Sequence, residues 1–524
     1  MENHDTFYNF LNKNLEQEKN KIFNIKNFIP DLILRYQEEE KNYVFPLELN
    51  QSCLSQFSCK SIRNIQYISF QYDCGQINQS IFDLIGEALF LLTNLQQLSL
   101  IFTCCYKIGV FQLKNLYEGI MSVNKLEEFT LEFHNTQNNF DNEQFQHLSN
   151  VLKRQTHLKK LRLCLGDQDD CKEGYLQLLD SLALLKDLTM FNLINKYYNS
   201  NFCRQDAYEV GQRLKQLTQL QSLSIFVDEF TGFDDSAGNY LGQSISNLIN
   251  LKYLTLKIEN NEINDQGINN LFRCLEFMNN LIYLNLEIHS TINAEGAQQL
   301  SNYIKNKTKL ETLKLLFGKN NKIGDQGAIS LGNSLKFLLN LKNFKLYLFK
   351  NSFGKAGGLS LANGIEYLNK LEKFKYFNQN DFQEAFVDFY KKLSNLKNLK
   401  SIQINECGAY QLNPYQNVGQ FLQVPTIASN LQQLSLYLRY NDLIPYLKQG
   451  FQQYQKLNCI KIKFHFAFTF TFMNDLIDLI QLIVKIPNLR VIQFGQLKLE
   501  PILFKNIVRK IKRLVIIINN SIKA

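Results

Sequence analysis

The chain has 524 residues, of which 45% are hydrophobic and 20% are charged, and its formal net charge is +9 at pH 7. This composition is typical of a soluble globular protein and excludes a disordered or collagen-like chain. The excess of 57 basic over 48 acidic residues is small for this length. It describes a solvated surface and does not indicate binding to nucleic acid.

The first 60 residues precede any repeat and are predicted to form a helical N-terminal cap. Phe7, Phe10, Leu11 and Leu15 have helical spacing. The opening segment is polar and lacks the basic and apolar regions of a secretory signal, which favours a cytoplasmic location. Residues 29–34, Ile-Pro-Asp-Leu-Ile-Leu, resemble the opening of an F-box. That resemblance implies an alternative function, substrate adaptor of a ubiquitin ligase.

After the cap, a motif of the form apolar-x-x-apolar-x-apolar returns sixteen times, mostly every 28 to 32 residues. A fixed period of this size predicts a solenoid, in which each unit buries its apolar face by stacking on its neighbours. The motifs begin at Ile65, Leu95, Leu126, Leu158, Leu188, Leu220, Leu251, Leu281, Leu310, Leu341, Leu371, Leu399, Leu431, Leu457, Leu489 and Ile511.

Each unit changes its hydrophobic period halfway along. In the unit that starts at Leu251, residues 254, 256 and 258 alternate as in a strand, and residues 268, 271, 275 and 278 follow with helical spacing. Between them lies a turn with Asp265 and Gly267, and the unit from Leu310 repeats it with Asp325 and Gly327. We expect these aspartates to cap the helix that follows.

The strings LKYLTLKIENNEINDQGINNL and LETLKLLFGKNNKIGDQGAISL resemble leucine-rich repeats of the ribonuclease-inhibitor-like class. The resemblance implies an α/β solenoid, a horseshoe with a parallel inner sheet and outer helices. It covers a domain of about sixteen units from residue 61 to 518, followed by a short tail from 519 to 524. The class is a binding scaffold, so it implies a non-catalytic protein-interaction function without naming the partner. A GTPase-activating regulator of the horseshoe class is a second alternative, with Arg204 as its candidate arginine.

No pattern in the sequence indicates an enzyme, a metal site or a cofactor. The eleven cysteines form no C-x-x-C pair, and the six histidines show no metal-ligand spacing. Cys274 is expected to be a buried hydrophobe and the others reduced thiols. The most apolar stretch, residues 464–486, carries Asp475, Asp478 and Lys485 and begins with strand period, which argues against a membrane span.

The inner face of the sheet is the predicted contact surface. Residues two, four and six positions after each motif start should face away from the core. In the central units they form rows of lysine and tyrosine, which favour a protein partner with an acidic patch. The predicted partner-binding residues are Tyr253, Lys257, Tyr283, Lys314, Lys345, Tyr347, Lys373 and Lys375.

The C-terminal edge is predicted to be a site of self-association. The last motif ends in the apolar run from Ile511 to Ile518, and only six residues follow it. A final strand exposes unpaired N–H and C=O groups, and six residues are too few to cover it. Val515 and Ile517 are expected on the inner face.

Overall fold

A computed structural model describes most of the repeat region and part of the N-terminal segment. It divides into two compact units, Met1–Leu251 and Lys252–Ala524, and each is described by itself. The described residues are 31–38, 41–46, 65–73, 79–90, 92–103, 110–134, 140–165, 172–195, 204–227, 233–259, 263–289, 292–318, 321–348, 351–378, 386–406, 430–438, 454, 456–464, 482–483, 485–486, 488–495 and 515–519.

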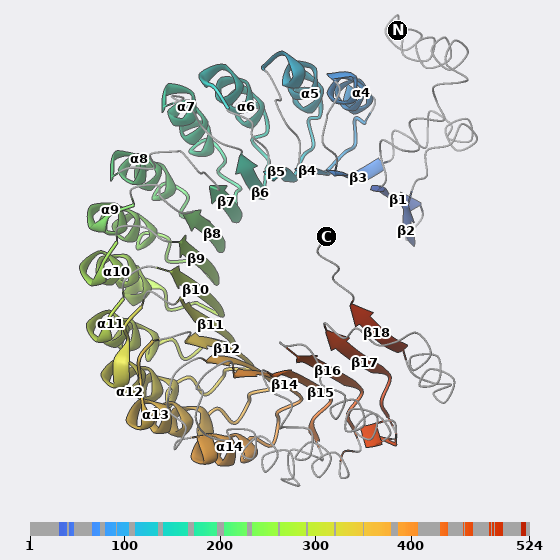
Figure 1. Cartoon of the computed structure of the whole chain (residues 1–524). Helices are drawn as coiled ribbons and strands as arrows, with labels where there is room; N and C mark the ends of the chain where they lie inside the picture. The colour runs from blue at the N-terminus through green and yellow to red at the C-terminus, as the bar shows by residue number, and fades with distance from the viewer. Residues whose placement is uncertain are drawn as a thin grey trace, which may run out of the picture. The chain divides into compact units, whose positions relative to one another are not determined.

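The first unit alternates strands and helices from the first repeat onward (Figure 1). Strands β3 to β8 pair in sequence order, each parallel to the next. The strands are β3 (Ile65–Asp73), β4 (Gln97–Thr103), β5 (Glu128–His134), β6 (Lys160–Leu165), β7 (Met190–Asn195) and β8 (Ser222–Val227). The helices are α4 (Gln79–Phe90), α5 (Val110–Ser122), α6 (Asn142–Arg154), α7 (Lys172–Leu182), α8 (Arg204–Leu214) and α9 (Asp235–Ile245).

The second unit continues the same alternation. Strands β9 to β18 again pair in sequence order and in parallel. The strands are β9 (Tyr253–Glu259), β10 (Tyr283–His289), β11 (Thr312–Phe317), β12 (Asn343–Leu348), β13 (Lys373–Asn378), β14 (Ser401–Glu406), β15 (Gln433–Leu438), β16 (Cys459–Phe464), β17 (Val491–Gly495) and β18 (Val515–Asn519). The helical segments are α10 (Asp265–Phe272), the 3₁₀ helix η2 (Arg273–Phe277), α11 (Ala294–Ile304), α12 (Gly324–Leu335), α13 (Lys355–Glu366) and α14 (Phe386–Ser394).

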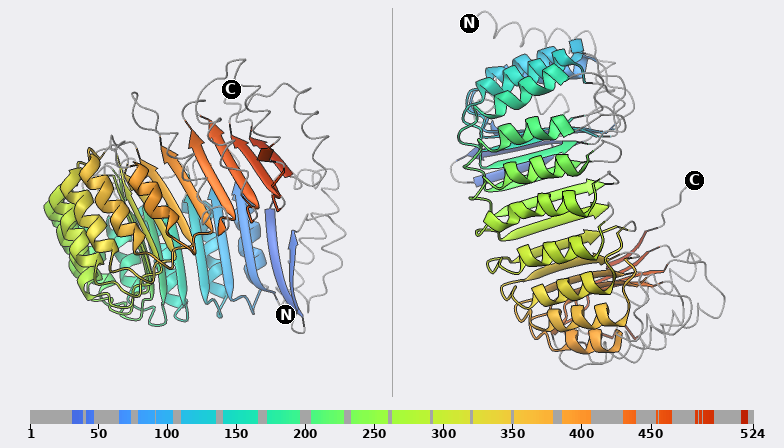
Figure 2. Two further views of the ribbon diagram at one scale, coloured as in Figure 1. Left: turned by 90° about the horizontal axis from the view of Figure 1, so that it is seen from below. Right: turned by 90° about the vertical axis from the view of Figure 1, so that its left-hand side faces the viewer.

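Within each unit the described helices stack side by side on one face of the sheet (Figure 2). The motif residues point toward them: Leu254, Leu256 and Ile258 of β9 are almost completely buried. The alternate residues of the same strand lie on the opposite face, which no described helix covers and which we call the helix-free face. The predicted α/β repeat solenoid with parallel strands is therefore confirmed, because strand period and helix period fall where the sequence places them.

The N-terminal segment differs from the predicted helical cap where the structure describes it. Residues 31–46 form two strands, β1 (Asp31–Glu38) and β2 (Lys41–Pro46), which pair in antiparallel fashion. β1 also pairs with β3 in antiparallel fashion. The physical reason is that β3 would otherwise leave an open edge, and a hairpin satisfies its backbone groups. Residues 29–34, which resemble an F-box opening, lie mostly in β1, and the rest of the predicted cap lies outside the described residues.

The aspartates of the turns do not cap their own helices and instead bind the start of the next repeat's helix. Asn264 caps α10, since its side chain accepts a hydrogen bond from the Gln266 amide at 2.9 Å. Asp265 reaches the next repeat instead and accepts from the Asn293 amide at 2.8 Å. Asp325 likewise accepts from the amides of Gly354 and Gly357, both at 2.8 Å, at the start of α13. These carboxylates therefore join consecutive repeats.

Buried asparagines tie the turns of the second unit together. The side-chain Nδ2 of Asn321 donates to the Ile288 carbonyl at 2.9 Å, and its Oδ1 accepts from the backbone N–H of Ile292 at 2.7 Å. Asn351 occupies the equivalent place one repeat later and donates to the Phe317 carbonyl at 3.3 Å. Each side chain thus adds hydrogen bonds to backbone groups of the preceding repeat.

The last repeat and the ends of the repeat domain are described only in part. β18 pairs in parallel with β17, with Val515 opposite Val491 and Ile517 opposite Gln493. The last repeat is therefore shifted by two residues from the predicted register, because Val491 is two residues after the motif start Leu489 and Val515 is four residues after the motif start Ile511. A shift of two keeps the alternation between the two faces. The domain limits at residues 60 and 518 stay predictions. Among the residues that the structure describes, none of the helices combines the length and the apolar character needed to cross a membrane.

Candidate partner-binding face

All eight predicted contact residues lie on strands β9 to β13 of the second unit, and the pairing register aligns them in rows. Lys314 of β11 is directly opposite Lys345 of β12, which is directly opposite Lys375 of β13. Tyr253 and Tyr283 are likewise opposite each other on β9 and β10. The rows predicted from the repeat period are therefore present, because a constant offset from the motif start becomes a constant register in a parallel sheet.

The two tyrosines form the end of the face nearest β9. Their ring centroids are 6.3 Å apart, and Tyr253 is 45% exposed. Lys314 donates a hydrogen bond from Nζ to the Tyr283 hydroxyl at 2.7 Å. The same Nζ is 4.9 Å from the ring centroid, an oblique position that makes the hydroxyl, not the ring face, its main partner.

Lys345 is the central cation of this lysine row. Its Nζ lies 4.4 Å from the ring centroid of Tyr347, two residues along the same strand. Partial burial lowers the pKa of Lys345, and the neighbouring Lys314 and Lys375 lower it further, while Glu287 acts in the opposite direction. The ammonium group is thus held in an unfavourable position that an anion from outside would relieve.

An apolar row runs beside the lysine row. Leu316, Tyr347 and Phe377 are opposite one another on β11, β12 and β13. The rings of Tyr347 and Phe377 stack with centroids 3.8 Å apart and planes inclined by 16°. The predicted set contains only Tyr347 from this row. Counting six residues from each motif start would also have found Leu316 and Phe377.

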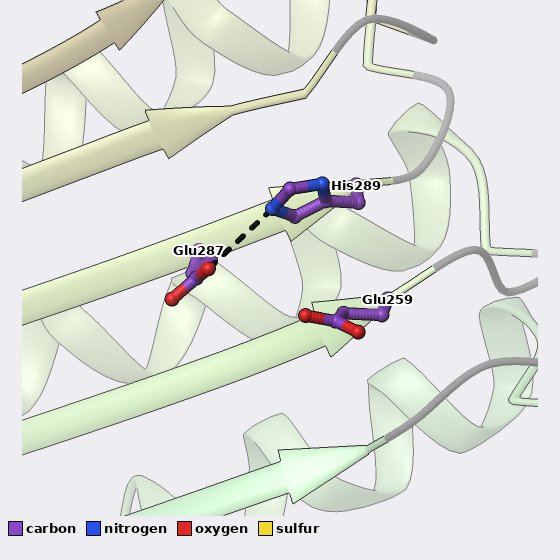
Figure 3. A group of neighbouring side chains, drawn as sticks. All are labelled: Glu259, Glu287 and His289. Atoms are coloured by element: carbon purple, nitrogen blue, oxygen red, sulfur yellow. Dashed lines mark ion pairs between the residues drawn. The ribbon is translucent and has the colours of Figure 1, made fainter. Parts of the chain in front are cut away.

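A cluster of mixed charge occupies the carboxyl ends of β9 and β10 (Figure 3). Glu259, Glu287 and His289 each place a potential ligand atom within 4.8 Å of the other two. His289 Nε2 is 3.5 Å from Glu287 Oε1, and a hydrogen bond from this imidazole lowers the pKa of Glu287 against the effect of burial. Two carboxylates and an imidazole are a donor set that could hold a divalent metal ion.

The cation that the structure places at this cluster is Lys257. Its ammonium group forms an ion pair with Glu259 and lies 3.9 Å from Glu287. A metal ion would have to compete with this ammonium. Lys257, although on the predicted contact surface, is therefore already engaged within the protein and contributes less free positive charge than the lysine row.

Comparisons with known proteins add little to this picture. The chain matches no family model and no curated protein sequence. A chain of the crystal structure of the Rad7 and Elc1 complex from yeast is similar, with 15% sequence identity and a TM-score of 0.36. The match covers 74% of this chain and 83% of that one. A similarity at this level supports no statement about function.

Proposed function

We propose that the protein is a non-catalytic interaction scaffold of the ribonuclease-inhibitor-like leucine-rich repeat class, which binds a protein with an acidic patch on the helix-free face of its second unit. The observation that carries this proposal is the lysine row. Lys314, Lys345 and Lys375 are aligned on adjacent strands about 4.8 Å apart. Like charges directly opposite each other destabilise a sheet by a fraction of a kcal/mol per pair.

A lysine-rich composition alone does not explain this row. One residue after the motif start, charges of opposite sign alternate from one strand to the next. At this offset Lys342 pairs with Glu311 at 2.9 Å, and Lys400 pairs with Glu372 at 3.2 Å. The three lysines of the row form no ion pair with any described residue. The sheet pairs its lysines directly with carboxylates at one offset from the motif start, whereas the described residues at the other offset form no such ion pair, which supports a role in binding.

The two parallel rows further define the partner. Lysines 314, 345 and 375 and the apolar residues 316, 347 and 377 are two positions apart on each strand, about 6.6 Å. A partner that offers carboxylates beside apolar side chains would satisfy both rows at once. Tyrosines are favoured anchors of such interfaces, and Tyr253 and Tyr283 extend the surface toward β9.

The two alternatives have less support. The ubiquitin-ligase adaptor depends on residues 29–34, and the described part of that segment is strand β1. The GTPase-activating regulator depends on Arg204, which is the first residue of α8 in the other unit. Proteins captured from a lysate of the source cells distinguish them, because ligase subunits or a small GTPase would favour the corresponding alternative.

Charge reversal on the lysine row tests the proposal. In the double variant Lys345→Glu with Lys375→Glu, we expect capture of acidic partners and binding of a fluorescent oligoglutamate peptide to be lost. Binding to the unchanged protein should weaken as salt rises, since exposed charges are screened within about 10 Å at 0.1 M. Lys305→Glu with Lys336→Glu is the control, because it changes the net charge equally on the helix side of the same unit. Equal binding by both double variants would refute the proposal.

A further inference from the structure

A second group of reactive side chains lies on the helix-free face of the first unit, far along the sequence from the lysine row. Glu132 and His134 are on β5, and Arg162 and Cys164 are on β6. The register places Cys164 directly opposite Glu132. Glu132 and Cys164 are buried, while the side chain of His134 is 20% exposed. The group therefore reaches solvent through the imidazole and through Arg162, whose side chain is 44% exposed.

The contacts within the group form a chain from thiol to carboxylate. Cys164 Sγ is 3.5 Å from His134 Nδ1 and 3.7 Å from the Phe133 carbonyl oxygen. The other ring nitrogen of His134, Nε2, is 2.5 Å from Glu132. Because an ionised carboxylate only accepts hydrogen bonds, Nε2 must carry a hydrogen atom and donate a hydrogen bond to Glu132. In the neutral ring, Nδ1 is then the acceptor that faces the thiol.

Glu132 is held in its ionised form. Burial raises the pKa of its carboxyl group, but hydrogen bonds from His134 and Arg162 outweigh burial and leave that pKa below its usual range. The carboxylate therefore orients the imidazole and stabilises the charge that the ring acquires when it takes a proton from the thiol. Glu132 and Arg162 balance each other, so a thiolate and an imidazolium would leave the group with no net charge.

We propose that Cys164 is a peroxide-reactive thiol, activated by His134 and Glu132, and that small hydroperoxides oxidise it to a sulfenic acid. The assignment is independent of the partner-binding function of the second unit. A thiol becomes nucleophilic when it loses its proton, and an adjacent imidazole supplies the base. Burial of Cys164 leaves no room for a peptide or ester substrate. A hydroperoxide is small enough to enter beside the partly exposed side chains of His134 and Arg162 while the imidazole stays next to the thiol.

The reaction balances without another reactant. The thiol proton passes to His134 Nδ1, and the thiolate attacks one oxygen of the hydroperoxide. An S–O bond forms as the O–O bond breaks, and the electron pair of that bond leaves with the second oxygen. That oxygen takes the proton from the imidazolium and departs as water or an alcohol. Sulfur loses two electrons and the hydroperoxide gains them, which gives the sulfenic acid of Cys164.

The chain provides its own control for this reaction, Cys274. This thiol is as buried as Cys164, but it lies in η2 on the helix side of the second unit, where burial raises its pKa to about 12 although the Lys307 ammonium acts in the opposite direction. The folded protein is treated with hydrogen peroxide, then denatured with dimedone present to trap sulfenic acids, and each cysteine peptide is quantified by mass spectrometry. Cys164 should be oxidised at least about a hundredfold faster than Cys274, the lower end of what a positioned base contributes.

Variants of the relay complete the test. His134→Gln should bring the oxidation rate of Cys164 down to that of Cys274, and Glu132→Gln should lower it while the imidazole remains in place. If His134→Gln unfolds the first unit, Cys164 becomes more reactive instead of less, and Glu132→Gln then supplies the comparison. Equal oxidation of Cys164 and Cys274 in the unchanged protein would overturn the proposal. Unchanged reactivity of Cys164 in the folded Glu132→Gln variant would also overturn it.

Discussion

Lys345, at the centre of the proposed contact row, is held in the folded chain at the expense of stability. Burial and two neighbouring lysines lower the pKa of Lys345 in the folded chain, so the unfolded chain binds its proton more tightly. Folding stability should therefore rise with pH between the lowered pKa and the ordinary value of 10.5. We predict that Lys345→Gln removes this rise, so that any stability advantage of the variant shrinks as pH increases. Urea unfolding at several pH values measures it, with Lys336→Gln as the control.

At the same scale, the sequence predicted the lysine row but missed the relay of Glu132, His134 and Cys164. The row emerged because the repeat period was used to align residues across strands. The same alignment places Glu132 and Cys164 six residues after their motif starts, and so on adjacent strands. His134 and Cys164 are 30 residues apart, so no motif of residues close in sequence contains both. Applied to nucleophilic and basic residues as well as to lysines, the repeat period predicts that these side chains meet on adjacent strands.

Among the elements, the helix termini depend on the preceding repeat, and α13 shows it most clearly. Its N-cap is Gly354, which has no side chain to offer, and Asp325 of the preceding repeat supplies both hydrogen bonds. One repeat before Asp325, the equivalent residue is Ala294, which has no acceptor to offer to the next helix. That next helix is α12, and it has no side-chain cap. That helix starts instead at Gly324, whose φ of +59° suits glycine.

We therefore predict that Asp325→Ala destabilises the second unit by about 1–2 kcal/mol, the usual cost of losing a helix cap. Asp325→Asn, which keeps an acceptor oxygen, should cost less. The matched control is Glu295→Ala, an acidic residue in the first turn of α11. Chemical unfolding followed by circular dichroism provides the free energies. Similar losses for Asp325→Ala and Glu295→Ala would show that α13 does not need a cap from its neighbour.

Whether a segment forms a helix or a strand could be predicted within the regular repeats, and less well in the segment before the first repeat. The switch from strand period to helix period located the strands and most helices of both units. It did not distinguish an α-helix from the 3₁₀ turn at residues 273–277, because both place the buried Cys274 and Leu275 against the core. The helical cap predicted for residues 1–60 was wrong for residues 31–46, where the structure has two strands, because an edge strand needs backbone partners. Local spacing does not express this requirement of the neighbouring repeat.

For the whole molecule, the end of the array sets the association state that we predict. β18 is the last described strand, and Ile517 occupies the register position of Gln493 on β17. In a solenoid each strand is completed by the next, so the final one offers its backbone groups to another chain unless something covers them.

We predict that the isolated protein associates at tens of micromolar and that Ile517→Lys shifts it toward the monomer, since a charge on an edge strand opposes pairing. Light scattering measures the molar mass, and Ile517→Val is the control that keeps the position apolar. A monomer in the unchanged protein, with no change in Ile517→Lys, would mean that the edge is already covered within one chain.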